Sequence, residues 1–215
     1  KQNISTTEPV TMTTTAGNLL VFFCGTYGST TITGPGGDWQ TIRNESGTPT
    51  LASFYKTAVG GSESPSCTWT GSTTGAAMFL EYSGQDNSPL LASASANGSG
   101  DNTIECPLAT TNSSRNQVYI SGFIFEDDEL ASTWSNGFTE REDLNTGGGA
   151  PGTRIGAAVA DLITTDGSQS TTATMGAGTD DWRCHTLAFT SAYDFFEGYV
   201  YTDDDAATPI GSQDV

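Results

Sequence analysis

The feature that most constrains the fold of this chain is an internal repeat with a period of roughly one hundred residues. Four landmarks recur in the same order in the two halves. They are "NLLVFFCGTYG" with "NQVYISGFIFE", "GGDWQTI" with "SNGFTER", "LASFYKTAVGGSES" with "IGAAVADLITTDGSQS", and "CTWTGSTTGAAMFLEYSG" with "TATMGAGTDDWRCHTLAFTSA". Each half supplies about five short segments with the composition of strands, so the pattern predicts two fused, divergent repeats of one β-rich unit.

The repeated segments predict an all-β fold, an antiparallel and jelly-roll-like β-sandwich. "GAAVADLI", from Gly156, is the best candidate for a helix, but its β-branched ending and its strand-like twin "LASFYK" favour a strand. We expect repeats at about 5–84 and 104–192 to share one core within a sandwich over 1–192. The segment that begins with "DNSPLLASAS" is predicted to connect them, and "TIECPLAT" to match the opening strand "EPVTMTTT".

Residues 193–215 have no counterpart in the first half. This tail carries five aromatic residues, more than a free solvated end would hold: Tyr193, Phe195, Phe196, Tyr199 and Tyr201. It is predicted to be either an extra strand on the parent sandwich or a docking arm that adds to a neighbouring subunit.

The charge balance narrows the classes of partner. The chain has 25 Asp and Glu against 7 Lys and Arg, a formal net charge of -18. Phosphate backbones would be repelled, so nucleic acid is excluded as an expected partner. The longest apolar run, "LLVFFC" from Leu19 to Cys24, has the length of a strand and not of a membrane span, so no membrane insertion is expected.

Four cysteines, Cys24, Cys67, Cys106 and Cys184, lie far apart and show no CxxC spacing, which argues against a zinc site. They are either small buried residues or the members of one or two disulfides. Four cysteines allow three connectivities, and the spacing selects none of them.

Catalytic chemistry finds little support. The single histidine, His185, matches Met78 of the first half, so we expect it to face the core rather than to serve a Ser-His-Asp triad. A glycosidase would need two carboxylates across a cleft. The candidates are Glu81, Glu105, Glu126, Glu140 and Glu142, and Glu81 is expected to be solvated on the outward face of its strand.

Acidic turns are the candidate metal sites. Asp127, Asp128 and Glu129 form the main cluster, with shorter acidic runs at 179–181 and 203–205, and calcium is the ion that such oxygen-rich loops take. None of the three has the spacing of an EF-hand loop. Apart from this candidate calcium, no cofactor is expected.

Aromatic residues beside polar turns are the candidate glycan platforms. Trp134 in "STWSNG" and Trp182 in "DDWRC", the latter next to Asp181, fit this description, whereas Trp39 and Trp69 are expected in the core.

Several of these motifs together resemble a known repeat. The set of "AGNLLVFF", "GGDWQTI", "FYKTAVGGSESPSCTWTGS" and "FLEYSG", followed by "NGFTERED" and "TLAFTSA", is similar to a tandem β-sandwich repeat of secreted bacterial surface proteins and tailed-virus virion proteins, such as fibre and decoration proteins. The chain departs from that repeat at Asn18, where Asp is usual, before Pro65, where a serine is interposed, and after Tyr82, where an arginine is lacking. The resemblance covers roughly residues 5–192 and implies surface display without established catalytic residues.

We therefore expect a non-enzymatic structural or adhesive protein on a virion surface or outside cells. A capsid decoration or fibre protein is the preferred form, an oligomer that binds itself or other virion or surface proteins. The alternative is a carbohydrate-binding module or lectin-like adhesin whose partners are surface glycans.

Overall fold

The computed structural model describes residues 7–9, 11–28, 30–70, 74–111, 115–126, 131–145, 154–176, 180–191, 197–201 and 208–209. Within these ranges the chain is all-β, and all paired strands run antiparallel. The predicted antiparallel all-β fold is confirmed, and the segment from Gly156 lies in a strand. The described residues hold no helix that could cross a membrane.

The first half contains β1 (Thr7–Pro9), β2 (Met12–Thr14), β3 (Leu19–Thr26), β4 (Ile32–Thr33), β5 (Gln40–Glu45), β6 (Thr50–Thr57), β7 (Gly61–Glu63), β8 (Ser66–Trp69) and β9 (Gly75–Ser83). β10 (Gln85–Asp101) follows β9 and connects the two halves. The second half contains β11 (Thr103–Ala109), β12 (Gln117–Glu126), β13 (Ala131–Trp134), β14 (Thr139–Asn145), β15 (Ile155–Thr164), β16 (Gln169–Met175) and β17 (Asp180–Ser191). The tail contributes β18 (Glu197–Tyr201) and β19 (Thr208–Pro209).

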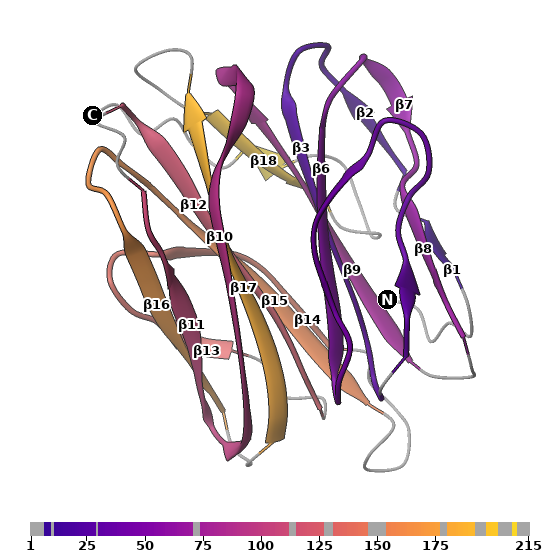
Figure 1. Cartoon of the computed structure of the whole chain (residues 1–215), viewed down its shortest axis with the longest axis vertical. Coiled ribbons are helices and arrows are strands. Elements are labelled where there is room, and N and C mark those ends of the chain that lie inside the picture. The colour runs from indigo at the N-terminus through magenta and orange to yellow at the C-terminus, as the bar shows by residue number, and fades with distance from the viewer. Residues whose placement is uncertain are drawn as a thin grey trace.

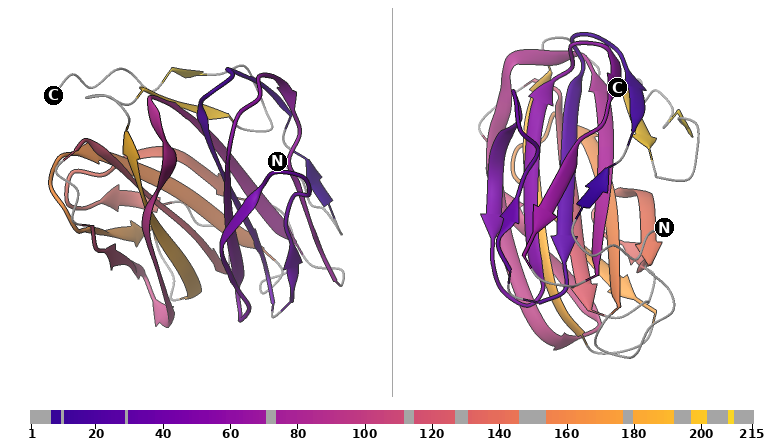
Figure 2. Two further views of the ribbon diagram at one scale, coloured as in Figure 1. Left: turned by 45° about the horizontal axis from the view of Figure 1, so that its top comes forward. Right: turned by 90° about the vertical axis from the view of Figure 1, so that its right-hand side faces the viewer.

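The strands form four layers that follow one another across Figure 1. Two large sheets, β19-β18-β9-β3-β6-β5 and β10-β17-β12-β15-β14, lie in the middle. The small sheets β1-β8-β4 and β2-β7 cover the outer side of the first, and β11-β16-β13 covers the outer side of the second. Each half is thus a sandwich, and the two sandwiches pack together through their large sheets, as the views in Figure 2 also show.

The two halves have matching strand orders. In each large sheet a central strand, β3 or β12, lies between a closing strand, β9 or β17, and a second neighbour, β6 or β15, which in turn pairs with β5 or β14. In the small sheets, β1 beside β8 corresponds to β11 beside β16. This is the order expected of a repeated unit, while the origin by duplication and the jelly-roll-like connection stay predictions.

The segment expected to connect the halves is itself the longest strand. β10 pairs with β17 from Gln85↔Ser191 to Asp101↔Asp180, with three breaks in register on the way. After Leu91, small side chains alternate along "ASASANGSG", a weak strand pattern without large apolar residues, so the sequence resembled a loop. β11 lies beside β16 as β1 lies beside β8, while the expected twin of β11, "EPVTMTTT", spans both β1 and β2.

Strands of the large sheets are buried on both faces. All eight residues of β3 are buried. Leu19, Val21 and Phe23 face the second half, while Leu20 and Phe22 face the small sheets of their own half. The continuous run "LLVFF" therefore reflects two covered faces rather than one covered and one solvated face.

Two glycines let the large sheets approach closely. A Cβ at Gly25 would lie 2.2 Å from Cδ1 of Ile124, and a Cβ at Gly122 would lie 2.7 Å from the ring of Phe23. Each half thus inserts a large side chain over a glycine of the other half. Because such interdigitated packing tolerates little displacement, it holds the two sandwiches in one relative orientation.

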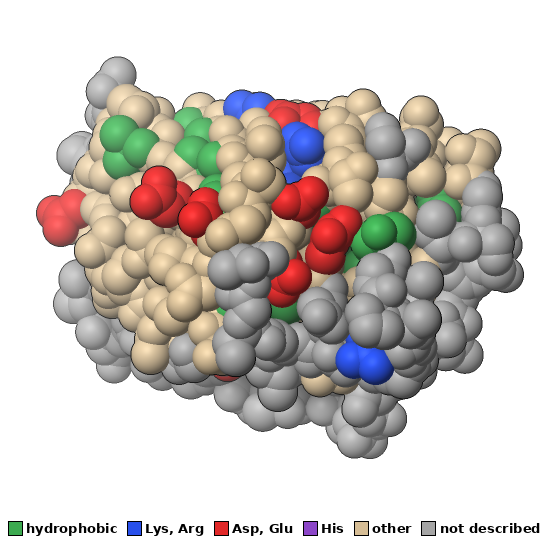
Figure 3. Space-filling view, turned by 90° about the horizontal axis from the view of Figure 1, so that it is seen from below, with side chains coloured by type: hydrophobic (Ala, Val, Ile, Leu, Met, Phe, Trp, Pro, Cys, Tyr) green, Lys and Arg blue, Asp and Glu red, His purple; other side chains and the backbone are tan. Residues whose placement is uncertain are grey.

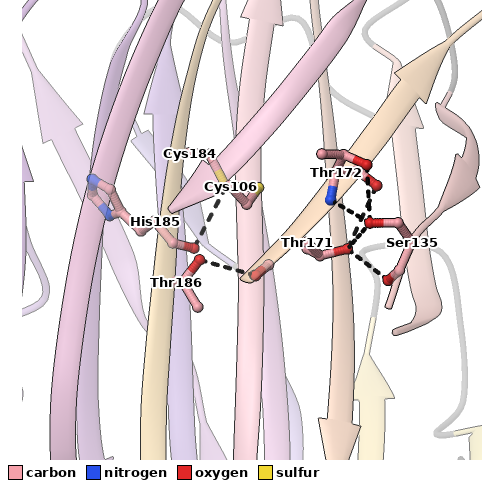
Figure 4. The surroundings of a disulfide bond; sticks show 8 residues. Cys106, Ser135, Thr171, Thr172, Cys184, His185 and Thr186 are labelled. Carbon is pink, nitrogen blue, oxygen red and sulfur yellow. Dashed lines mark hydrogen bonds between the residues drawn. A yellow bond between two sulfur atoms is a disulfide. The ribbon is translucent and has the colours of Figure 1, made fainter. Parts of the chain in front are cut away.

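A disulfide joins the two layers of the second half. Cys106 of β11 and Cys184 of β17 are bonded, with a Cα–Cα distance of 5.4 Å and a sequence separation of 78 residues. Figure 4 shows Cys184 pointing toward β11 while the next residue, His185, points to the opposite side of β17. The Cys106–Cys184 bond is thus one of the candidate disulfides, and the thiols of Cys24 and Cys67 are buried between the large sheet and the small sheets of the first half.

Candidate functional site

The edges of the large sheets are completed by strands that cross between the halves. β10 follows β9 of the first half and pairs with β17 of the second. β18 follows β17 of the second half and pairs with β9 of the first, from Glu197↔Ser83 to Tyr201↔Phe79. Each half thus adds a strand to the sheet of the other, and without β18 the backbone edge of β9 would lack its neighbour.

Of the tail, β18 and β19 are paired within their own chain, while the choice between an extra strand and a docking arm stays a prediction. Tyr199 and Tyr201 lie in β18. Tyr193, Phe195 and Phe196 lie outside the described residues.

Neither predicted glycan platform presents an open aromatic face. Trp182 is 4% exposed and is packed between the large sheet and the small sheet of the second half. Trp134 is half-buried, with its ring 5.2 Å from that of Phe123 and its indole N–H donating to Glu140 at 2.8 Å. Asp181, half-buried, neighbours Trp182 in β17 but does not line the pocket beside it. The expectation of exposed stacking surfaces is wrong, because the small sheet β11-β16-β13 covers this face of β17.

A pocket of about 300 Å³ nevertheless lies beside Trp182. Its walls come from β10 and the start of β11, including Asn97, Gly98, Asp101 and Glu105. The indole N–H of Trp182 is buried and has no hydrogen-bond partner among the described residues. The sequence did not indicate that Asp101 lies near Trp182, because their proximity depends on the pairing of β10 with β17.

A second pocket, of about 290 Å³, lies in the first half beside Trp39. The Lys56 Nζ atom lies 2.8 Å from each carboxylate oxygen of Glu63 and 5.5 Å from the centre of the Trp39 ring. Trp39 is half-buried against Phe22 and Phe79, and Trp69 is buried. The lysine and the glutamate pair with each other, and Asp38 is the remaining charged residue of the described lining.

His185 lies in the core, as predicted. It is fully buried, and its Nδ1 atom is 3.1 Å from the hydroxyl of Ser53 in the first half. Burial lowers the pKa of His185 to about 3, although the nearby carboxylate of Glu45 acts in the opposite direction. A serine beside a histidine suggests nucleophilic catalysis, but both side chains are inaccessible and a neutral imidazole with this pKa is a weak base.

The polar groups around His185 join the two halves. Arg43 donates to Ser95 at 3.1 Å and to the Ser93 carbonyl oxygen at 2.7 Å, and Ser95 donates to Glu45 at 2.6 Å. Arg183 donates to Glu45 at 3.3 Å. Burial raises the pKa of Glu45, but hydrogen bonds from Ser95 and Arg43 outweigh burial and leave it below its ordinary value.

A second buried group crosses the same interface. Tyr82 of β9 donates to Asp161 of β15 at 2.8 Å, and Arg141 of β14 lies 2.7 Å from the same carboxylate. Burial raises the pKa of Asp161 despite these bonds, and burial beside Asp161 raises the pKa of Tyr82 well above its ordinary value. The side chains of Tyr82, Asp161 and Arg141 thus bind one another in the interior.

The expected position of Glu81 is wrong. Its side chain is 1% exposed, and its carboxylate accepts the backbone N–H of Thr15 and the side-chain amide of Asn18, both at 2.7 Å. Its strand face is the outer face of the large sheet, which the first-half small sheets cover. Of the other glutamates, Glu105 is exposed, Glu126 and Glu142 are half-buried, and exposed Glu140 is the partner of Trp134.

The predicted calcium ligands Asp127, Asp128 and Glu129 lie outside the described residues, as does the run at 203–205. Among the residues that the structure does describe, no group of three or more His, Cys, Asp or Glu side chains could hold a metal ion.

Comparison of this chain with protein-family models, with curated proteins and with solved structures finds no match.

Proposed function

We propose that this chain is a non-enzymatic structural or adhesive block on an exterior surface, most simply a capsid decoration or fibre component of a virion. The observation that carries the proposal is the reciprocal exchange of β10 and β18 between the two halves. Adding a strand to the open edge of a sheet is also a common way for separate subunits to join. The same β18 strand added to β9 of a neighbouring copy would link chains into an oligomer.

Rigidity supports the same function. The shared core, the Arg183–Glu45 ion pair and the Tyr82–Asp161 hydrogen bond join the halves and favour one orientation of the two sandwiches, which suits a protein that transmits force or displays a surface. The Cys106–Cys184 disulfide suits an oxidising environment outside the cell.

The acidic character sets the conditions for assembly. Copies with a net charge of -18 repel one another, and acidic side chains lie across the middle of the face seen in Figure 3. Because salt screens such repulsion over about 10 Å at 0.1 M, assembly should strengthen as the salt concentration rises.

The test measures both mass and strand pairing. Light scattering is recorded for the full chain and for a chain that ends at Ala192, at low and high salt. In parallel, a variant with Ser83→Cys and Glu197→Cys, which pair across β9 and β18, is oxidised and run on a non-reducing gel. Ser83→Cys alone is the control.

Assembly of the full chain but not of the shortened chain, with covalent dimers or longer ladders of the double variant, is the expected result. A monomeric mass at every salt concentration, together with a cross-link confined to single chains, would refute self-assembly through β18.

A further inference from the structure

The indole N–H of Trp182 is a hydrogen-bond donor that the fold leaves without an acceptor. Trp182 is paired in β17 between Gly98 of β10 and Phe125 of β12. A Cβ at Gly98 would lie 2.6 Å from the indole Nε1 atom, so only glycine fits beside the N–H edge, and both residues line the same pocket. Leaving a buried donor unsatisfied costs about 1–3 kcal/mol, so the arrangement calls for a partner from outside the described chain.

The pocket beside this donor supplies acceptors of its own. Asp101 and Glu105, both exposed, line it from the last residue of β10 and from β11. Asn97, also exposed, adds a side chain that can both donate and accept. The described lining holds no Lys or Arg, so its charge is negative.

These groups select the chemistry of the ligand. An anion would be repelled by the two carboxylates. A metal ion or an ammonium group could bind the carboxylates, but neither can accept a hydrogen bond from an indole N–H. A hydroxyl group does both, because it accepts one hydrogen bond and donates another.

We propose that the Trp182 pocket binds a neutral polyhydroxylated ligand, a single sugar residue. One hydroxyl accepts from the Trp182 N–H, and hydroxyls of the same ligand donate to Asp101 and Glu105. A volume of about 300 Å³ is at the small end of ligand pockets and suits one ring rather than an extended chain. The sugar is held by the edge of the indole and not by stacking on its face, because Trp182 is almost fully buried.

The direct experiment is saturation-transfer NMR on the full chain with methyl glucoside, methyl galactoside and methyl mannoside, followed by a glycan array. Trp182→Phe keeps the aromatic packing and deletes only the donor. Trp134→Phe is the matched control, since it removes the other indole N–H of this half, which is bonded to Glu140 outside the pocket. Thermal unfolding of each variant confirms that it folds.

We expect saturable binding of at least one sugar by the unmodified chain and by Trp134→Phe. Trp182→Phe should weaken it by roughly tenfold or more, because the ligand hydroxyl loses a buried donor. Glu105→Gln, a change at an exposed residue, should weaken it as well and keeps the test decisive if Trp182→Phe does not fold.

Two results would overturn the proposal. One is the absence of binding to the three glycosides and to every neutral glycan on the array. The other is calcium binding by calorimetry that is lost in Glu105→Gln and kept in Trp182→Phe, which would identify a cation site. The pocket is formed by β10, β11 and β17 of one chain and does not involve β18, so a failure of sugar binding is separate from a failure of assembly through β18.

Discussion

The enclosure of His185 between the two sandwiches predicts a specific acid sensitivity. The folded-state pKa of about 3 lies below the ordinary value of 6.5, so between these values the unfolded chain binds a proton that the folded chain does not. The contribution of His185 to stability is therefore complete above pH 6.5 and is lost as the pH falls toward 3. The loss is up to about 1.4 kcal/mol per pH unit, or roughly 2–3 kcal/mol between pH 7 and pH 4.5.

His185→Met isolates this contribution from the many carboxyl groups of the chain. Methionine is the matched choice because Met78 faces the same shared core from the corresponding strand of the first half. The free energy of unfolding is measured in urea at pH 7, 5.5 and 4.5 for both proteins. The unmodified chain should lose about 2–3 kcal/mol more than His185→Met over this range.

Because the chain has one histidine, its ring protons can also be followed by NMR without an assignment problem. A ring that titrates near pH 6.5 in the folded protein, or a difference between the two proteins that does not change with pH, would refute the burial of His185 at this interface.

Three further changes test the packing and the ion pairs, each by urea unfolding. Arg141→Gln leaves the Asp161 carboxylate, which is 1% exposed, without its cation and should lower the free energy of unfolding by about 3–5 kcal/mol. Arg115→Gln removes a pair whose side chains are 65% and 33% exposed and should lower it by less than about 1 kcal/mol. Equal losses in the two variants would contradict this account. Replacing Cys106 and its disulfide partner by alanine opens a link across 78 residues and should cost about 4.5 kcal/mol by the chain-entropy relation, and an unchanged stability would contradict it. Gly122→Ala places a methyl group against an aromatic ring of the other half and should cost about 1–3 kcal/mol, while Gly36→Ala, which meets nothing within 4 Å, should be neutral.

Much of the fold was readable from local sequence patterns. Strand segments and the turns between them follow from apolar alternation and from glycine-rich turns, and both depend on residues close in the chain. For His185, the matching position of Met78 also predicted its place in the core. β10 was missed because its small polar residues lack the signal of a strand.

The candidate sites were less accessible to such reasoning. Trp182 was chosen as an exposed platform from its polar neighbours, and Glu81 as a solvated carboxylate from strand alternation. Both are buried, because a second layer covers a face that alternation alone would assign to water. The uninterrupted run from Leu19 was the one sequence signal that both faces of a strand are covered.

Local residue preferences were enough to establish that the chain is all-β, which segments form most strands, and that His185 lies inside. Tertiary structure alone decided the four layers, the exchange of β10 and β18, the choice of Cys106 and Cys184 as the disulfide, and the meeting of Asp101 and Glu105 with Trp182. The physical reason is distance along the chain. Secondary structure reflects steric and hydrophobic preferences of neighbouring residues, whereas these features arise between segments tens of residues apart, whose contact depends on how whole sheets pack.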